Sequence, residues 1–99
     1  MPYEIGWSVN AMEDVAELFD YLAENASLWD ASDVTERILQ STDKLADFPR
    51  LYEADEHYGI GIRRISLLGQ HVLYEVDDTV QRITVLAVVG QRQNPRSIR

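Results

Sequence analysis

Two histidines and a group of arginines are the side chains in this sequence with the most chemistry to offer. His71 stands in a stretch of alternating apolar residues, and an imidazole that titrates near neutral pH can serve as a general acid or base. A single strand histidine is more often a hydrogen-bonded structural residue, so we assign it no catalytic role. His57 follows Glu56 in a predicted loop without further partners, so we expect no metal site there. The absence of cysteine excludes disulfides and thiolate metal sites.

Charge is distributed unevenly along the chain. Residues 1–58 hold 14 acidic and 3 basic residues, whereas residues 59–99 hold 3 acidic residues and 6 arginines. This division indicates two surfaces with different partners, although a solvated acidic helix face would also produce it. The net charge of −8 argues against non-specific binding to nucleic acid, which depends on neutralising phosphates.

Three of the arginines lie in a C-terminal tail, residues 91–99, beyond the last predicted strand. The tail is either a frayed basic terminus or a contact surface for a target. Our candidates for target binding combine the tail with two strand residues: Arg64, His71, Arg92, Arg96 and Arg99.

The first half of the chain predicts a short strand and a helical hairpin. The strand covers Tyr3 to Ser8. The first helix starts at Asn10 as N-cap, with Glu13 completing a capping box. A second helix runs from about Leu28 to Asp47 behind Ser27, and Pro49 ends it. The apolar stripes of the two helices are Val15, Leu18, Phe19 and Leu22, and Ala31, Val34, Ile38, Leu45 and Phe48.

The second half predicts a loop and three strands. The loop covers residues 49–60, and the strands cover 62–67, 71–77 and 82–89, with Gly69-Gln70 as the first turn and Asp77 to Thr79 as the second. The second half of the last strand is apolar on both faces, as in a central strand. Further expectations concern single side chains: Tyr74, Trp7 and Trp29 pack inside, while Arg63 and Arg64 point to opposite faces, one of them toward a helix acid.

This order, β-α-α-β-β-β, indicates an α+β fold in which a helical hairpin packs on a small, mainly antiparallel sheet. A chain of 99 residues forms one domain, residues 1–99. The N-terminus lacks the features of a signal peptide, and the longest apolar run, residues 85–89, is too short to span a bilayer. We therefore expect a cytoplasmic protein with no membrane partner and no cofactor.

Several segments, in this order and spacing, resemble the toxins of the RelE/ParE superfamily. They are residues 16–22 (AELFDYL), 45–49 (LADFP), 61–64 (GIRR), 71–77 (HVLYEVD) and 83–92 (ITVLAVVGQR). The resemblance covers roughly residues 5–94. It implies the toxin of a type II toxin–antitoxin system. RelE-like members cut mRNA on the ribosome, and ParE-like members poison DNA gyrase.

The residues expected for RelE-like cleavage are incomplete in this chain. RelE uses lysines and an arginine on the sheet, an arginine after the last strand and a C-terminal tyrosine. Arg64 matches one of the sheet lysines, but Ile62 stands at the position of the other. His71 replaces the sheet arginine, and Asn94 stands where the arginine after the last strand would be. The sequence stops before the position of the tyrosine. Each general acid or base contributes about 10²–10⁴-fold to a rate.

The resemblance therefore implies a ParE-like gyrase inhibitor that is not an enzyme. A RelE-like ribosome-dependent mRNA endonuclease is the alternative, and a toxin that has lost its activity and serves a regulatory complex is a third possibility.

The resemblance also implies a protein partner, a ParD-like antitoxin, through which alone the complex would contact operator DNA. Such an antitoxin has a C-terminal segment, disordered when free, that lays a helix along the hairpin and adds a strand to the sheet. The helices carry apolar residues off their buried stripes beside many acids. Our candidates for antitoxin binding are Glu17, Asp20, Tyr21, Glu24 and Leu39.

Overall fold

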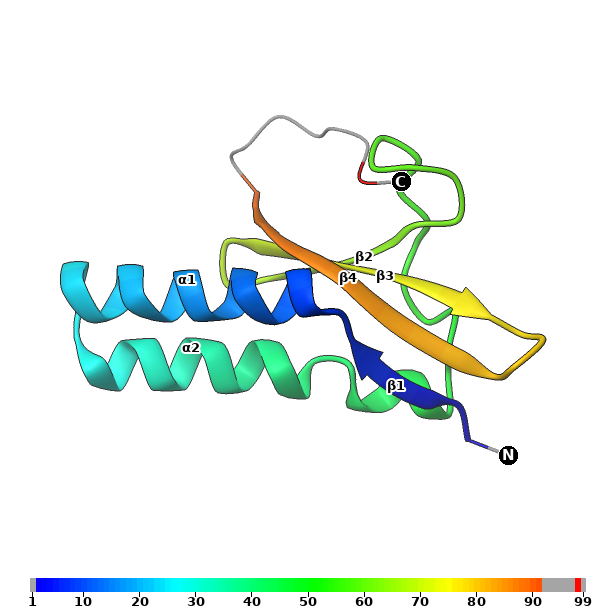
Figure 1. Ribbon diagram of the computed structural model, residues 1–99, viewed down its shortest axis with the longest axis horizontal. Coiled ribbons are helices and arrows are strands. Elements are labelled where there is room, and N and C mark those ends of the chain that lie inside the picture. The colour runs from blue at the N-terminus through cyan, green and yellow to red at the C-terminus, as the bar shows by residue number, and fades with distance from the viewer. Residues whose placement is uncertain (1, 92–97, 99) are drawn as a thin grey trace.

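A four-stranded sheet with a helical hairpin on one face makes up the protein (Figure 1). The computed structural model describes residues 2–91 and residue 98. The elements, in chain order, are β1 (Glu4–Trp7), α1 (Val9–Asn25), α2 (Leu28–Gln40), the short 3₁₀ helix η1 (Asp43–Ala46), β2 (Arg63–Leu67), β3 (Gln70–Asp77) and β4 (Arg82–Gly90).

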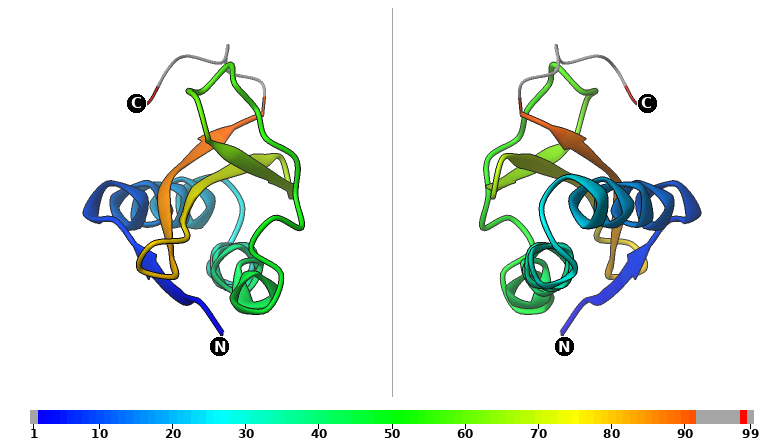
Figure 2. Two further views of the ribbon diagram at one scale, coloured as in Figure 1. Left: turned by 90° about the vertical axis from the view of Figure 1, so that its right-hand side faces the viewer. Right: turned by 90° about the vertical axis from the view of Figure 1, so that its left-hand side faces the viewer.

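The sheet order is β1-β4-β3-β2, with β1 parallel to β4 and the other neighbours antiparallel. This arrangement confirms the predicted α+β fold and the central position of the last strand. Figure 2 shows the helices on one side of the sheet and the loop that precedes β2 on the other. Among the described residues, no helix is both long and apolar enough to cross a membrane.

The helix α1 begins two residues earlier than predicted. Ser8, not Asn10, is the N-cap, and its hydroxyl accepts a hydrogen bond from the Ala11 amide at 3.0 Å. Asn10 lies within the first turn and donates its side-chain amide to the Leu86 carbonyl at 3.4 Å. The predicted capping box with Glu13 is therefore wrong. Ser27 caps α2 as predicted, accepting from the Asp30 amide at 3.0 Å.

The second helix is shorter than predicted, because it ends at Gln40 instead of Asp47. Hydroxyl groups compete for backbone carbonyls at this point: Ser41 donates to the Ile38 carbonyl at 2.6 Å, and Thr42 donates to the Leu39 carbonyl at 3.3 Å. The chain then tightens into η1, which still buries Leu45 completely. Phe48 lies beyond η1 and is 62% exposed, so its predicted place in the buried stripe is wrong.

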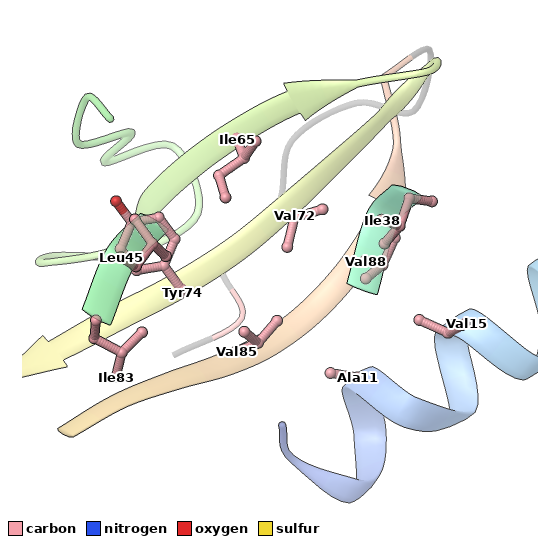
Figure 3. Packing of buried hydrophobic residues seen from close by; sticks show 10 residues of the cluster. All are labelled: Ala11, Val15, Ile38, Leu45, Ile65, Val72, Tyr74, Ile83, Val85 and Val88. Atoms are coloured by element: carbon pink, nitrogen blue, oxygen red, sulfur yellow. The ribbon is translucent and has the colours of Figure 1, made fainter. Parts of the chain in front are cut away.

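Two apolar clusters of described residues pack on the two faces of the sheet. The larger one, the helix-side core, lies between the sheet and the helical segments (Figure 3); its buried members are Ala11, Val15, Ile38, Leu45, Ile65, Val72, Tyr74, Ile83, Val85 and Val88. The smaller one, the loop-side core, lies on the opposite face; its buried members are Tyr58, Ile62, Leu73 and Ala87. Tyr74 is fully buried in the helix-side core, as the alternation predicted.

The two tryptophans have different environments. Trp7 packs against the helix-side core from the end of β1, as predicted. Trp29 is 72% exposed, and its predicted packing role is wrong. It stands in the first turn of α2, where the hairpin extends beyond the sheet (Figure 1), so no strand covers it.

A β-bulge lies at Leu86 of β4. Before the bulge the outer edge of β4 pairs with β1, and after it the same edge contacts α1. Tyr74 pairs with Val85 while Leu73 pairs with Ala87, so Leu86 has no partner on β3. Its carbonyl accepts the Ser8 hydroxyl at 3.2 Å, and the next outward amide, that of Val88, donates to the Asp14 carboxylate at 2.9 Å. The far half of β4 is therefore tied to α1, and a groove opens between them.

The turn between β2 and β3 contains a strained residue. Leu67 pairs with Gln70, so the turn residues are Leu68 and Gly69, one position earlier than predicted. Both have positive φ, 51° and 78°, as a type I′ turn requires. Glycine adopts this region freely, whereas for leucine it costs roughly 1–2 kcal/mol.

We expect Leu68→Asn to raise the free energy of unfolding by up to about 1 kcal/mol, because asparagine tolerates positive φ and Asn-Gly favours this turn. Urea denaturation would measure the change. Leu68→Ala is the control, since alanine removes the leucine side chain without relieving the backbone. A gain as large with alanine would show that the side chain, not φ, is the cause.

Candidate functional site

The sheet face opposite the helices carries the two strand residues that the sequence singled out for target binding. Arg64 and His71 both lie on this face, on neighbouring strands β2 and β3. The loop between η1 and β2 covers part of the same face, because Tyr58 and Ile62 from this loop are buried against Leu73. The two candidates thus stand beside a packed apolar cluster.

His71 is held by a loop tyrosine. Its Nδ1 lies 2.8 Å from the Tyr58 hydroxyl, and the two rings meet edge to face with centroids 5.9 Å apart. Burial lowers the pKa of His71, and the nearby Arg64 charge lowers it further, against a smaller opposing effect of Asp55. Burial likewise raises the pKa of Tyr58. Both side chains are therefore favoured in their neutral forms, joined by a hydrogen bond between the Tyr58 hydroxyl and His71 Nδ1.

Arg64 is paired with an acid that the sequence analysis did not single out. Its Nη1 donates to Asp55 Oδ2 at 2.9 Å, and the other carboxylate oxygen of this buried aspartate accepts from the His57 backbone amide at 3.1 Å. The His57 ring Nδ1 also lies 3.0 Å from Asp55 Oδ1. Burial opposes ionisation of Asp55, but the hydrogen bonds from His57 and the charge of Arg64 outweigh it and lower its pKa. Asp55 is therefore a carboxylate that neutralises Arg64.

Arg63 points to the helix side, so the prediction that the two arginines face opposite ways is confirmed. Its Nη1 donates to the Tyr52 carbonyl at 2.7 Å. The prediction that one arginine meets a helix acid is wrong, because Arg64 pairs with Asp55 from the loop. That partner lies nine positions away in a segment with no regular spacing, so no sequence pattern indicates it.

A shallow hollow of about 490 Å³ opens beside this pair, lined by Ala54, Asp55, Glu56, His57 and Arg64. Two carboxylates face one arginine there, so the hollow does not favour a phosphate. Within residues 2–91 and residue 98, no group of three or more histidines and carboxylates could hold a metal ion. What the arrangement does is tie the loop to β2.

The C-terminal tail contributes to this face through Ile98. Its side chain packs on the loop-side core, and its amide donates to the Tyr58 carbonyl at 2.8 Å. At Ile98 the tail therefore contacts the loop that precedes β2. The three tail candidates, Arg92, Arg96 and Arg99, lie outside the described residues.

A second candidate surface is the groove between α1 and the far half of β4, which we call the α1–β4 groove. It has a volume of about 520 Å³, and its lining residues are Asp14, Glu17, Leu18, Tyr21, Gln70, Val88, Val89 and Gly90. Asp14, Leu18 and Tyr21 follow helical spacing, so they share a face of α1. That spacing could have added Asp14 and Leu18 to the candidates.

The structure divides the five predicted antitoxin contacts. Glu17 and Tyr21 line the α1–β4 groove, and Tyr21 is 61% exposed. Asp20 and Glu24 are exposed on the same helix but do not line the groove. Leu39 lies on α2 and is only 36% exposed. Of the five predicted antitoxin contacts, only Glu17 and Tyr21 therefore lie together in this groove.

Comparison with known protein families identifies the chain. The model of the ParE toxin of the type II toxin–antitoxin system parDE matches residues 5–95. The chain belongs to this family of ParE toxins. Among proteins of curated function, no sequence matches this ParE-family toxin.

Solved structures of similar shape support the same fold. A structure of the chromosomal ParDE system from P. aeruginosa superposes on this ParE-family toxin with a TM-score of 0.77 at 14% identity, over 89% of this chain and 95% of that one. A mutant of the E. coli toxin RelE in its free state gives 0.68 at 17% identity, over 93% and 86%. The intact E. coli RelBE toxin–antitoxin complex gives 0.63 at 18% identity, over 92% and 99%. At these identities, the similarity establishes the fold of this ParE-family toxin and nothing finer.

Proposed function

We propose that this ParE-family toxin acts by binding DNA gyrase and not by cleaving RNA. The observation that carries the proposal is the state of the loop-side face. His71 is hydrogen-bonded to Tyr58 and favoured in its neutral form, and Arg64 is paired with the buried Asp55. The two polar side chains that a nuclease would use on this face are therefore engaged in holding the loop.

RNA cleavage would require His71 and Arg64 to act on the substrate instead of holding the loop. A general base must reach the 2′-hydroxyl and a cation must stabilise the phosphorane, each with a free and directed atom. Releasing Arg64 would leave the Asp55 carboxylate, whose side chain is 9% exposed, without its cation, which is unfavourable. The RelE-like endonuclease is accordingly the second candidate, supported by the likeness of its fold.

We propose further that a ParD-like antitoxin neutralises this toxin in the cytoplasm and occupies the α1–β4 groove. The groove offers two carboxylates, of which Asp14 already accepts the Val88 amide and Glu17 is exposed, together with an exposed aromatic ring and apolar side chains. These features suit a basic, amphipathic segment that folds on binding. Any contact with operator DNA would then come through the antitoxin.

Two assays on one set of variants test the target. With purified gyrase and supercoiled plasmid, we expect the toxin to accumulate cleaved DNA, while primer extension on cellular mRNA after induction shows no codon-dependent cuts. His71→Gln retains an acceptor for Tyr58 but does not titrate, so it should remain toxic once circular dichroism confirms its fold. Codon-dependent cuts that disappear in His71→Gln would instead establish the nuclease.

A further inference from the structure

A groove on the opposite edge of the sheet from β1 takes no part in the functions proposed above. It lies between the end of α2 and the outer edge of β2, and its volume is about 360 Å³. Its lining residues are Arg37, Gln40, Ser41, Lys44, Tyr52, Ile65, Ser66 and Leu67. We call it the β2-edge groove.

The charge of the β2-edge groove is opposite to that of the α1–β4 groove. Its lining includes Arg37 and Lys44 and no acid, whereas the α1–β4 lining includes Asp14 and Glu17 and no base. In a chain with a net charge of −8, two basic side chains at one groove form a local exception.

Both cations are available to a ligand. Arg37 pairs with Asp33 at 3.4 Å, but both side chains are solvent-accessible, and such pairs contribute little. Lys44 is exposed and forms no ion pair with any described residue. The C-terminus of α2 adds a negative dipole equivalent to about half a charge, less than the two positive charges beside it.

The outer edge of β2 already pairs with an extended segment of this chain. Residues 53–55 run antiparallel to it: the Asp55 amide donates to the Ile62 carbonyl at 2.8 Å, and the Arg64 amide donates to the Glu53 carbonyl at 3.1 Å. Because outward groups alternate along an antiparallel strand, the next outward amide and carbonyl belong to Ser66.

The internal pairing stops one step before Ser66. In the register set by Ala54 opposite Arg63, the partner of Ser66 would be Leu51. The Leu51 amide instead donates to the Phe48 carbonyl at 3.1 Å, which turns the chain away from the sheet. Among the described residues, no segment therefore pairs with the outward backbone groups of Ser66, which lines the β2-edge groove, and an added strand can pair with them.

We propose that the β2-edge groove binds an extended, acidic segment of a protein partner, which adds a strand at Ser66. Its carboxylates lie near Arg37 and Lys44, and its apolar side chains pack on Tyr52 and Leu67. The open edge is short, so the affinity is micromolar instead of nanomolar. Its lining residues are not those invoked for gyrase binding, and its two cations disfavour the basic segment proposed for the α1–β4 groove.

The experiment uses the whole ¹⁵N-labelled toxin and two synthetic capped peptides, Glu-Val-Thr-Val-Glu-Val and Lys-Val-Thr-Val-Lys-Val. We expect the acidic peptide to shift the Ser66 amide resonance and slow its hydrogen exchange, and the basic peptide to bind at least tenfold more weakly. Equal binding of both peptides, or no change at Ser66, would overturn the proposal.

Matched variants separate the charge from the backbone. Arg37→Gln with Lys44→Gln should weaken binding about tenfold or more, whereas Arg50→Gln with Arg82→Gln, which changes net charge equally, should alter it less than twofold. Ser66→Pro removes an outward amide that β3 does not use and should abolish binding, while Ser66→Ala should retain it. If the proline variant does not fold, the two double glutamine variants still test the proposal. Equal losses of affinity in these two variants would refute the site.

Discussion

Replacing Tyr74 with alanine should lower the free energy of unfolding by about 3–5 kcal/mol, the range measured for large aromatic residues in cores. Tyr74 is fully buried at the centre of the helix-side core, on the strand next to β4. Its ring packs in the helix-side core beside Leu45 of η1 (Figure 3), so alanine would leave a cavity there. A domain of this size has a total stability of about 5–15 kcal/mol, so the loss is a large part of the whole.

Tyr74→Phe is the matched control because it keeps the ring. The hydroxyl forms no hydrogen bond of ordinary geometry with a described residue. Burial raises the pKa of Tyr74, and the nearby backbone of Tyr52 lowers it to a lesser extent. Removing this hydroxyl should therefore cost less than about 1 kcal/mol. Denaturant titration of both proteins measures the two effects, and a comparable loss in the phenylalanine variant would show that the hydroxyl, not the ring, stabilises the core.

Combining Glu17→Lys with Tyr21→Ala should weaken antitoxin binding on the order of 100-fold or more, on the proposal that the antitoxin occupies the α1–β4 groove. A tyrosine at the centre of an interface typically accounts for about 2 kcal/mol or more, and reversing a charge opposite a basic segment adds to it. Both side chains are exposed, so the fold should tolerate the changes.

The control for this prediction is Asp20→Lys, which makes the same change of charge on the same helix outside the groove. Titration of the antitoxin's C-terminal peptide against each variant gives the affinities, and repeating it at high salt should slow association to the unmodified toxin. Glu17→Lys alone is measured beside it, and an equal loss of affinity in Asp20→Lys would show that the contact is diffuse attraction to an acidic helix and not the groove.

Local patterns in the sequence were sufficient for the helices, the strands and the interior of the sheet. Alternation along residues 71–77 predicted that Val72, Tyr74 and Val76 share a face, and all three belong to or pack on the helix-side core. Ser27 could be recognised as a cap because its partner is three residues away. Such features depend on neighbours within one turn or one strand, where sequence spacing translates directly into geometry.

The positions of the helix ends and of the turn depended on competition between local alternatives. The spacing of residues in the sequence does not show which alternative is favoured. Ser8 and Asn10 can both cap a helix, and the Leu86 carbonyl, 76 or more positions away, engages both side chains once β4 is in place. In the same way, two hydroxyl groups end α2 early, where the pattern alone allowed it to continue.

The sequence by itself determined the family resemblance, the β-α-α-β-β-β order and the division between an acidic and an arginine-bearing half. Only the tertiary structure decided what the candidate residues do. It paired Arg64 with Asp55 and His71 with Tyr58, and it joined Glu17 and Tyr21 to residues 88–90 in one groove. These contacts connect a loop without periodicity, or elements about 70 positions apart, and their geometry exists only after the sheet has formed.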